Sequence, residues 1–138
     1  MDIKRLVSAS FILLSSGCIA SDKIEKTEFQ LFQDYAFSAC IANGYKDGDI
    51  YSDSISALNG YRARSRMPLE AHFGVNKVVE KWLAKPYKTS GGETTEIAAC
   101  LDLIKSDDLT ALYNQYTPCK DVSAWIDKSE FAVRCKNG

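Results

Sequence analysis

The sequence predicts an all-α fold, a compact bundle of about four to five helices braced by disulfides. Beyond residue 20, apolar side chains recur at helical spacing almost throughout the chain. Glycine and proline interrupt that spacing at intervals that suit short connections between helices. Four of the cysteines also lie in this stretch. We therefore expect residues 21–138 to form a single helical domain, which is long enough for one hydrophobic core.

The N-terminus has the pattern of a secretory signal. Lys4 and Arg5 precede an apolar run over residues 6–14, which is too short to span a bilayer as a mature helix. Cleavage after Ala20 would remove residues 1–20 as a signal peptide. Alternatively, Gly17-Cys18 ends a lipobox, and Cys18 becomes the lipidated first residue. Either route carries the chain across a bacterial inner membrane and predicts a periplasmic protein, soluble or lipid-anchored.

Export makes disulfides the expected use of the remaining cysteines, Cys40, Cys100, Cys119 and Cys135. Four cysteines allow three connectivities, and sequence alone does not decide between them. We favour Cys40 with Cys100, because both lie in similar helical contexts. We favour Cys119 with Cys135, because they flank one short segment. A zinc site is not expected, since no cysteine pair has ligand spacing and His72 is the only histidine.

Two helices are expected in the first half of the domain. The first should start near Asp22, where Asp22 and Glu25 have capping-box spacing, and stop at Gly44. The second should run from Asp49, as N-cap, through Tyr61. The stripes that predict these helices are Phe29, Phe32, Ala36, Ala39, Cys40 and Asn43 in the first, and Ile50, Ser54, Leu58 and Tyr61 in the second.

Three more helices and a tail follow. The third should contain Pro68 in its first turn and end at Lys85-Pro86. The fourth should hold Glu93 and Glu96 in its first turn, where the helix dipole favours acidic side chains. The fifth, or a bent continuation of the fourth, should have Ser106 as N-cap and end at Pro118.

Their expected apolar faces are Val75, Val78, Val79, Trp82 and Leu83; Ile97, Cys100, Leu101 and Ile104; and Leu109, Leu112, Tyr113 and Tyr116. The tail 119–135 is expected either as a short helix around 123–128 or as an extended segment held by its disulfide.

The residue types that commonly carry catalysis form no convincing site. His72, the candidate partner for a cysteine nucleophile, falls on the predicted polar face of the third helix. The pairs Glu93 with Glu96 and Asp107 with Asp108 are explained by helix first turns. A formal net charge of −1 without a basic cluster argues against nucleic-acid binding. We therefore expect no enzyme activity, no metal and no cofactor.

Three segments resemble one protein family in their order and spacing. They are DYAFSACIANGYKD at 34–47, WLAKPYKTSGGE at 82–93 and IAACLDLIKSDDLTALYNQY at 97–116. Together with the signal segment, they resemble the immunity proteins that protect bacteria from type VI secretion amidases. The resemblance covers residues 28–116. It implies an all-helical periplasmic homodimer that binds a papain-like peptidoglycan amidase, forms a heterotetramer with it and inhibits it sterically.

The segment best suited to such binding is the loop after the third helix. It is polar and glycine-containing, so it can enter a groove with little obstruction and donate backbone hydrogen bonds. Helices at both ends, one of them carrying Cys100, would reduce the entropy it loses on binding. The expected partner-binding residues are Tyr87, Lys88, Thr89, Ser90, Gly91, Gly92 and Glu93. Lys81, Trp82 and Lys85 are secondary candidates.

Two other functions stay open at this point. A periplasmic helical bundle could bind a lipid or peptide in a cavity lined by Phe29, Phe32, Phe73, Trp82 and Tyr113. A structural envelope lipoprotein would rest on Gly17-Cys18 alone and would have no affinity for an amidase.

Overall fold

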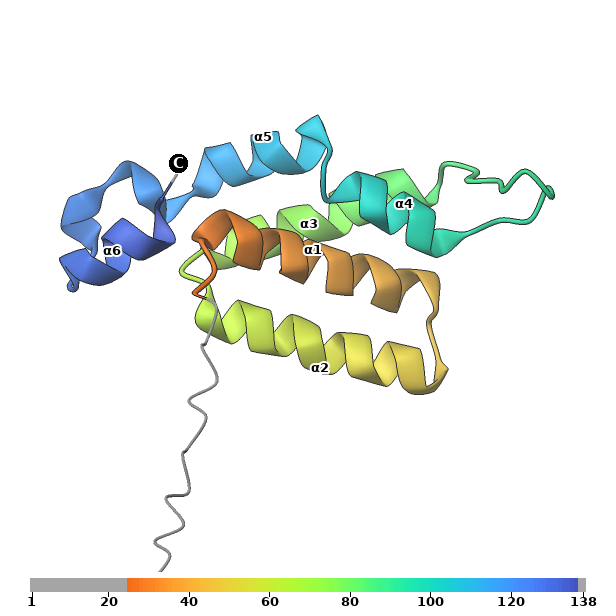
Figure 1. Cartoon of the computed structure of the whole chain (residues 1–138), viewed down its shortest axis with the longest axis horizontal. Helices are drawn as coiled ribbons and strands as arrows, with labels where there is room; N and C mark the ends of the chain where they lie inside the picture. The colour runs from red at the N-terminus through yellow and green to blue at the C-terminus, as the bar shows by residue number, and fades with distance from the viewer. Residues whose placement is uncertain (1–24, 137–138) are drawn as a thin grey trace, which may run out of the picture.

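The computed structural model describes residues 25–136, and within them the chain is all-α, as predicted. Figure 1 shows most of the helices packed around the first of them, with the last helix beyond one end of the bundle. The elements are α1 (Glu28–Gly44), α2 (Gly48–Arg64), α3 (Leu69–Leu83), α4 (Glu96–Leu103), α5 (Asp107–Tyr116), the short 3₁₀ turns η1 (Pro118–Lys120) and η2 (Val122–Ala124), and α6 (Lys128–Arg134). None of the described helices is long and apolar enough to cross a membrane.

Helix α1 is the centre of the bundle and contacts α2, α3, α4 and α5. Because α1 has neighbours on several sides, its buried side chains are spread over several faces of the helix and do not form a single apolar stripe. The prediction of its start was wrong. Thr27 is the N-cap, its hydroxyl accepts from the Gln30 amide, and the Gln30 side chain accepts from the Thr27 amide. The helix therefore begins after Thr27, and Asp22 lies outside the described residues.

Helices α2 and α3 follow their expected ranges closely. The N-cap of α2 is Asp47 rather than Asp49, because the helix begins at Gly48. Gly48 has φ +76°, which a glycine adopts readily at the turn from α1 into α2. Helix α2 packs on α1 and fully buries only Ser54. Helix α3 begins directly after Pro68 and turns Val75 and Val79 into the core.

Helix α4 is shorter than predicted and presents a different face. It begins at Glu96, so Glu93 belongs to the preceding loop. Ile97 and Leu101, expected to face inward, are 43% and 44% exposed. The buried face is Ala99, Cys100 and Leu103 instead. Cys100 is bonded to α1, and that tether sets the rotation of this eight-residue helix.

Both disulfides have the connectivity favoured from the sequence. Cys40 and Cys100 join α1 to α4 with a Cα–Cα distance of 5.6 Å, and both are fully buried. Cys119 and Cys135 close the tail with a Cα–Cα distance of 5.4 Å. The predicted N-cap of α5 is confirmed, since the Ser106 hydroxyl accepts from the Leu109 amide.

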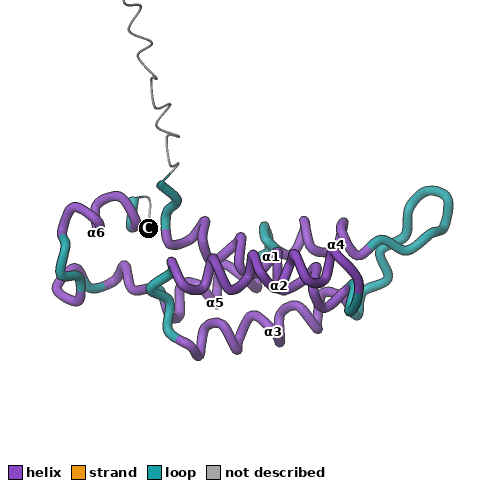
Figure 2. The backbone as a smooth tube through the Cα atoms, turned by 90° about the horizontal axis from the view of Figure 1, so that it is seen from below, coloured by secondary structure: helices purple, strands orange, loops and turns teal. Residues whose placement is uncertain are grey.

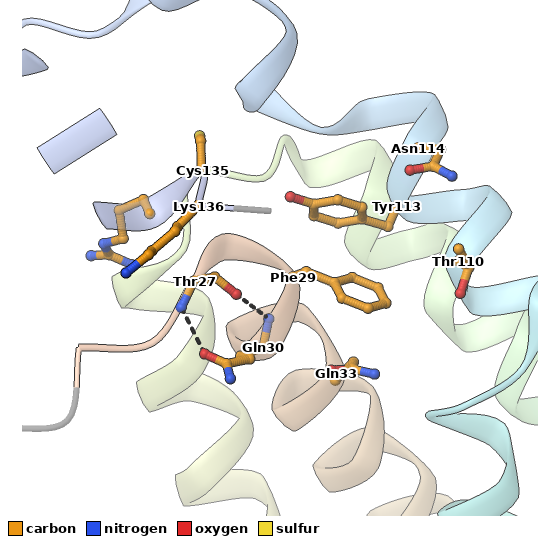
Figure 3. A pocket seen from close by; sticks show the side chains of 10 residues that line it. Thr27, Phe29, Gln30, Gln33, Thr110, Tyr113, Asn114, Cys135 and Lys136 are labelled. Carbon is orange, nitrogen blue, oxygen red and sulfur yellow. Dashed lines mark hydrogen bonds between the residues drawn. The ribbon is translucent and has the colours of Figure 1, made fainter. Parts of the chain in front are cut away.

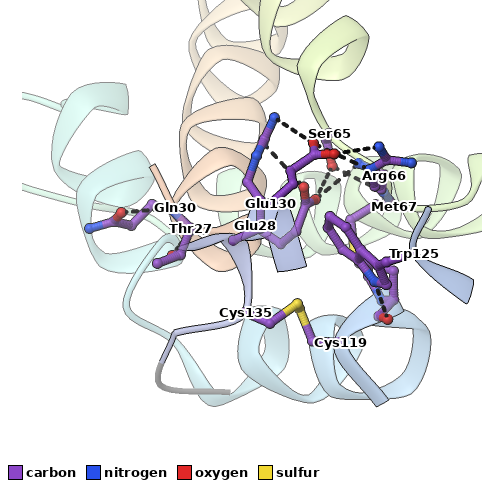
Figure 4. Close-up of polar contacts among 12 residues, drawn as sticks. Thr27, Glu28, Gln30, Ser65, Arg66, Met67, Cys119, Trp125, Glu130 and Cys135 are labelled. Atoms are coloured by element: carbon purple, nitrogen blue, oxygen red, sulfur yellow. Dashed lines mark hydrogen bonds and ion pairs between the residues drawn. A yellow bond between two sulfur atoms is a disulfide. The ribbon is translucent and has the colours of Figure 1, made fainter. Parts of the chain in front are cut away.

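Residues 117–136 form a compact element that we name the C-terminal clasp. Neither predicted form of the tail is correct, because the clasp combines two 3₁₀ turns with α6, which begins at Lys128. Trp125 is its core, at 2% exposed, and donates from Nε1 to the Pro118 carbonyl at 3.0 Å. The Arg66 guanidinium lies 4.7 Å from the Trp125 ring centroid (Figure 4). The clasp is thus anchored to the connection between α2 and α3.

A buried carboxylate fastens the clasp to α1. Glu28 is fully buried, and its Oε2 accepts from the Ser65 hydroxyl at 2.9 Å and the Arg66 amide at 3.0 Å. Its Oε1 accepts from Arg134 Nη1 at 3.2 Å. Arg66 also pairs with Glu130 at 2.6 Å, so α1, the α2–α3 connection and α6 share one charged network (Figure 4).

Candidate functional site

The connection between α3 and α4 projects from the end of the helical body opposite the C-terminal clasp (Figures 1 and 2). We name residues 87–93 the 87–93 loop. Lys88 and Thr94 form an antiparallel bridge at its base. The Thr95 amide donates to the Tyr87 carbonyl at 3.1 Å, and the Thr89 amide donates to the Glu93 carbonyl at 2.7 Å. The loop is therefore a small hairpin closed by its own backbone.

A tight turn forms the tip of this hairpin. The Gly92 amide donates to the Thr89 carbonyl at 2.9 Å, and the Glu93 amide donates to the Thr89 hydroxyl at 3.2 Å. Gly92 has φ +85°, a conformation that other residues rarely adopt. Gly91 has no such requirement, and a Cβ added there would meet only Thr89 Oγ1, at 3.6 Å. The two glycines therefore have different roles, a distinction that the sequence did not make.

All seven residues predicted as the binding segment lie together in this loop. Lys88 through Glu93 are exposed, and Tyr87 is half-buried at the base. The Tyr87 hydroxyl donates to Asp102 Oδ2 on α4 at 3.0 Å. Desolvation, followed by the bond to Asp102, raises the pKa of Tyr87 above its ordinary value. With one lysine and one glutamate, the loop is formally neutral.

The end of α3 beside the loop is held by one carboxylate. Lys81 Nζ contacts both oxygens of Asp108 at 2.8 Å, and Trp82 Nε1 donates to Asp108 Oδ2 at 3.0 Å. The bond from Lys81, and then that from Trp82, lowers the pKa of Asp108. Lys85 Nζ lies 3.4 Å from the Trp82 ring centroid. These side chains brace the base of the loop and leave Trp82 half-buried against the core.

His72 lies in the core, so the prediction that it faces solvent was wrong. It is 3% exposed, and its ring centroid lies 4.5 Å from that of Tyr35. Its Nδ1 lies 3.0 Å from the Pro68 carbonyl, which can only accept, so Nδ1 carries the proton. No described residue bonds to Nε2. Burial lowers the pKa of His72, with the Pro68 bond opposing and the charge of Arg62 assisting.

Among residues 25–136, the side chains that catalysis or metal binding commonly uses are paired or dispersed. The cysteines of this part of the chain are all paired in disulfides, so none can act as a nucleophile beside His72. No cluster of three metal-ligating side chains occurs there. Of the aromatic stripe considered for a cavity, Phe29 and Tyr113 line a pocket, whereas Phe32 is fully buried and Phe73 is 60% exposed.

The described chain is thus a small, disulfide-braced helical protein that presents one exposed, formally neutral loop. The family model Tai4, described as type VI secretion system (T6SS) amidase immunity protein, matches residues 30–113. Because that match spans more than half of the chain, this protein belongs to the family of T6SS amidase immunity proteins. The resemblance seen in the sequence is confirmed, and with it the function as immunity protein to an amidase effector.

Comparison with solved structures agrees on the fold. A chain in the structure of the effector–immunity system Tae4/Tai4 from Salmonella typhimurium has a TM-score of 0.61 and 21% sequence identity. The match covers 66% of this chain and 90% of that chain. No curated protein sequence matches this chain. The clasp lies beyond the segment matched by the family model.

Proposed function

We propose that this immunity protein inhibits its amidase sterically, by placing the 87–93 loop in the cleft that binds peptidoglycan peptides. No chemistry occurs on the immunity chain. The observation that carries the proposal is the hairpin at the end of the body, closed by its own backbone bonds and exposed from Lys88 to Glu93.

Preorganisation supports this role. The bridge at the base, the turn at the tip and the bond from Tyr87 to Asp102 hold the loop in one conformation before a partner arrives. The buried disulfide between Cys40 and Cys100 fixes α4, on which the loop ends. A loop ordered in advance loses less conformational entropy on binding, so more of its contact energy appears as affinity.

The chemistry of the tip suits a cleft that accepts peptides. Among the described residues, the backbone amides of Ser90 and Gly91 have no hydrogen-bond partner, so they are free to donate to a cleft. Their small side chains allow a close backbone approach. Ile97 and Leu101, exposed one turn apart on α4, add apolar area near the base of the loop.

The direct test is inhibition of the cognate papain-like amidase, which we expect to be encoded beside this protein. The full chain, exported and purified in oxidised form, is titrated against the amidase while cleavage of peptidoglycan peptides is followed. We expect stoichiometric inhibition at nanomolar concentration, competitive with the peptide substrate. Inhibition that is independent of substrate concentration would exclude occupation of the cleft.

A matched pair of variants tests the loop itself. Gly91→Phe adds a bulky side chain at the tip of the loop, where the backbone conformation does not require glycine. This variant should weaken inhibition at least tenfold. Gly60→Phe is the control, since Gly60 is exposed on α2 and a Cβ there meets nothing within 4 Å. Equal inhibition by the two variants would place the binding site away from the 87–93 loop.

We further propose a homodimer that binds two amidase chains as a heterotetramer. The family resemblance suggests this assembly, and exposed Leu69 and Phe73, four residues apart on α3, provide apolar surface that an interface between copies requires. Sedimentation of the free protein and of the complex should give masses of two and of two plus two chains. A complex of one chain with one amidase would refute the assembly while leaving inhibition intact.

We place this action in the periplasm. Two disulfides in so short a chain suit an oxidising compartment. The signal segment 1–20 and Cys18 lie outside the described residues. Mass spectrometry of the exported protein separates the two processing routes, because cleavage after Ala20 leaves Ser21 as the first residue, whereas lipidation leaves an acylated Cys18 that pellets with membranes.

A further inference from the structure

A pocket of about 410 Å³ opens at the other end of the molecule, where the first turns of α1, the middle of α5 and the last residues of the C-terminal clasp meet (Figure 3). None of its lining residues belongs to the 87–93 loop. One wall consists of residues 134–136, beyond the segment matched by the family model. The disulfide between Cys119 and Cys135 holds that wall in place.

The inner wall of this pocket is aromatic. The rings of Phe29 and Tyr113 pack with centroids 4.8 Å apart, tilted by 55°. Tyr113 is almost fully buried, and Figure 3 shows its hydroxyl directed toward the end of the clasp. Such a wall offers a fixed surface for an aliphatic side chain.

Carboxamide groups with unused hydrogen-bonding capacity line the pocket. Gln30 uses its Oε1 to accept from Thr27, which leaves its two N–H donors. Gln33 donates from Nε2 to the Ile104 carbonyl at 2.8 Å, which leaves Oε1 as an acceptor. The side-chain carboxamide of Asn114 forms no hydrogen bond to another described residue. Donors and acceptors of this kind match the N–H and C=O groups of a peptide.

The charge of the pocket is positive. Arg134 and Lys136 line it, and among residues 25–136 no carboxylate does. The charge of Arg134 is compensated by ion pairs with Glu28 and Glu130, which do not line the pocket. Lys136 forms no ion pair within residues 25–136, so its ammonium group is available to an anion.

We propose that this pocket binds a short peptide that ends in a free carboxylate. Lys136 pairs with the carboxylate, the carboxamides bind the peptide groups, and an aliphatic side chain rests on Phe29 and Tyr113. The volume is in the lower part of the range of small-molecule sites, roughly 300 to 1,000 Å³, and suits a di- or tripeptide. This site is separate from the 87–93 loop and does not depend on how the amidase is inhibited.

The test is a nuclear magnetic resonance titration of the full oxidised chain, ¹⁵N-labelled, with trialanine. We expect shifts confined to residues around the pocket. Trialaninamide lacks the carboxylate and should bind about tenfold more weakly, since bonds to a charged group are the stronger contacts. Acetate should cause no comparable shifts. Equal binding of the acid and the amide, or shifts elsewhere, overturns the proposal, and acetate binding as well as trialanine reduces the pocket to a simple anion site.

Two variants complete the test. Lys136→Ala should weaken trialanine binding about tenfold. Lys120→Ala is the matched control, because Lys120 is an exposed lysine of the same clasp that does not line the pocket. Both variants should keep the melting temperature of the parent protein, which separates lost binding from lost folding. Identical affinities of the two variants would refute the assignment.

Discussion

Replacing Arg134 by Met should destabilise the fold by about 3 kcal/mol, although the arginine belongs to the C-terminal clasp. The change removes the cation paired with the fully buried carboxylate of Glu28. Loss of one partner of a buried pair costs about 3–5 kcal/mol, because the remaining charge stays in a medium that solvates it poorly. The Arg134 side chain is itself 19% exposed, so water can partly solvate the unpaired carboxylate in the variant. We therefore expect a loss of stability at the lower end of that range.

The decisive measurement is a double-mutant cycle by urea unfolding at neutral pH with both disulfides intact. Glu28→Gln alone should cost about 1–2 kcal/mol, since an amide oxygen can still accept from Ser65 or Arg66. The double variant Glu28→Gln with Arg134→Met should be more stable than Arg134→Met alone, because it leaves no unpaired buried charge at this position. Arg64→Met, at the exposed end of α2, is the control and should change stability by less than about 0.5 kcal/mol. A double variant no more stable than Arg134→Met alone would refute this reasoning.

Three other perturbations test the core. Replacing Cys40 and Cys100 together by Ala should lower the free energy of unfolding by about 4 kcal/mol, because the bond spans 60 residues; an unchanged denaturation midpoint under oxidising conditions would contradict this. His72 is buried with its pKa below 6.5, so the unfolded chain takes up a proton that the folded chain resists; stability should be fully present above pH 6.5 and fall by up to about 1.4 kcal/mol per pH unit below it. This loss should be absent in His72→Phe when unfolding is followed between pH 7 and pH 5.5. Gly74→Ala should cost up to about 2 kcal/mol, because its Cβ would lie 2.7 Å from Leu112 Cδ1 and an overpacking cost of about 1–3 kcal/mol outweighs the roughly 1 kcal/mol that Ala gains over Gly in a helix; an unchanged or higher melting temperature would show that Leu112 can move aside.

The helices were predictable where local chemistry specifies them. Ser106 caps α5 as expected, because a hydroxyl before two acidic residues satisfies the first amides of a helix within the same segment. The start of α1 was missed because the sequence contains two capping-box patterns, and the helix begins at the second of them, after Thr27. The inner face of α4 was missed for a similar reason, since both Ile97 and Leu101 are apolar and only the bond from Cys100 to α1 sets the rotation.

The position of the 87–93 loop was predictable because polar and glycine residues mark a surface connection, while its role in binding stays a prediction. The closure of the loop into a hairpin was not predicted. The hairpin depends on backbone hydrogen bonds across the loop and on the bond between Tyr87 and Asp102, and no sequence pattern predicts either contact.

The sequence by itself determined the helical class, the positions of most helices and the exposed loop between α3 and α4, because these depend on residues near one another along the chain. The order of its segments also identified the family. Only the tertiary structure decided that Glu28 is a buried anchor and that a positive pocket lies beside it. Glu28 finds its partners 37 to 106 residues away, and the pocket joins the two ends of the described chain. Such contacts follow from packing, which local sequence patterns do not record.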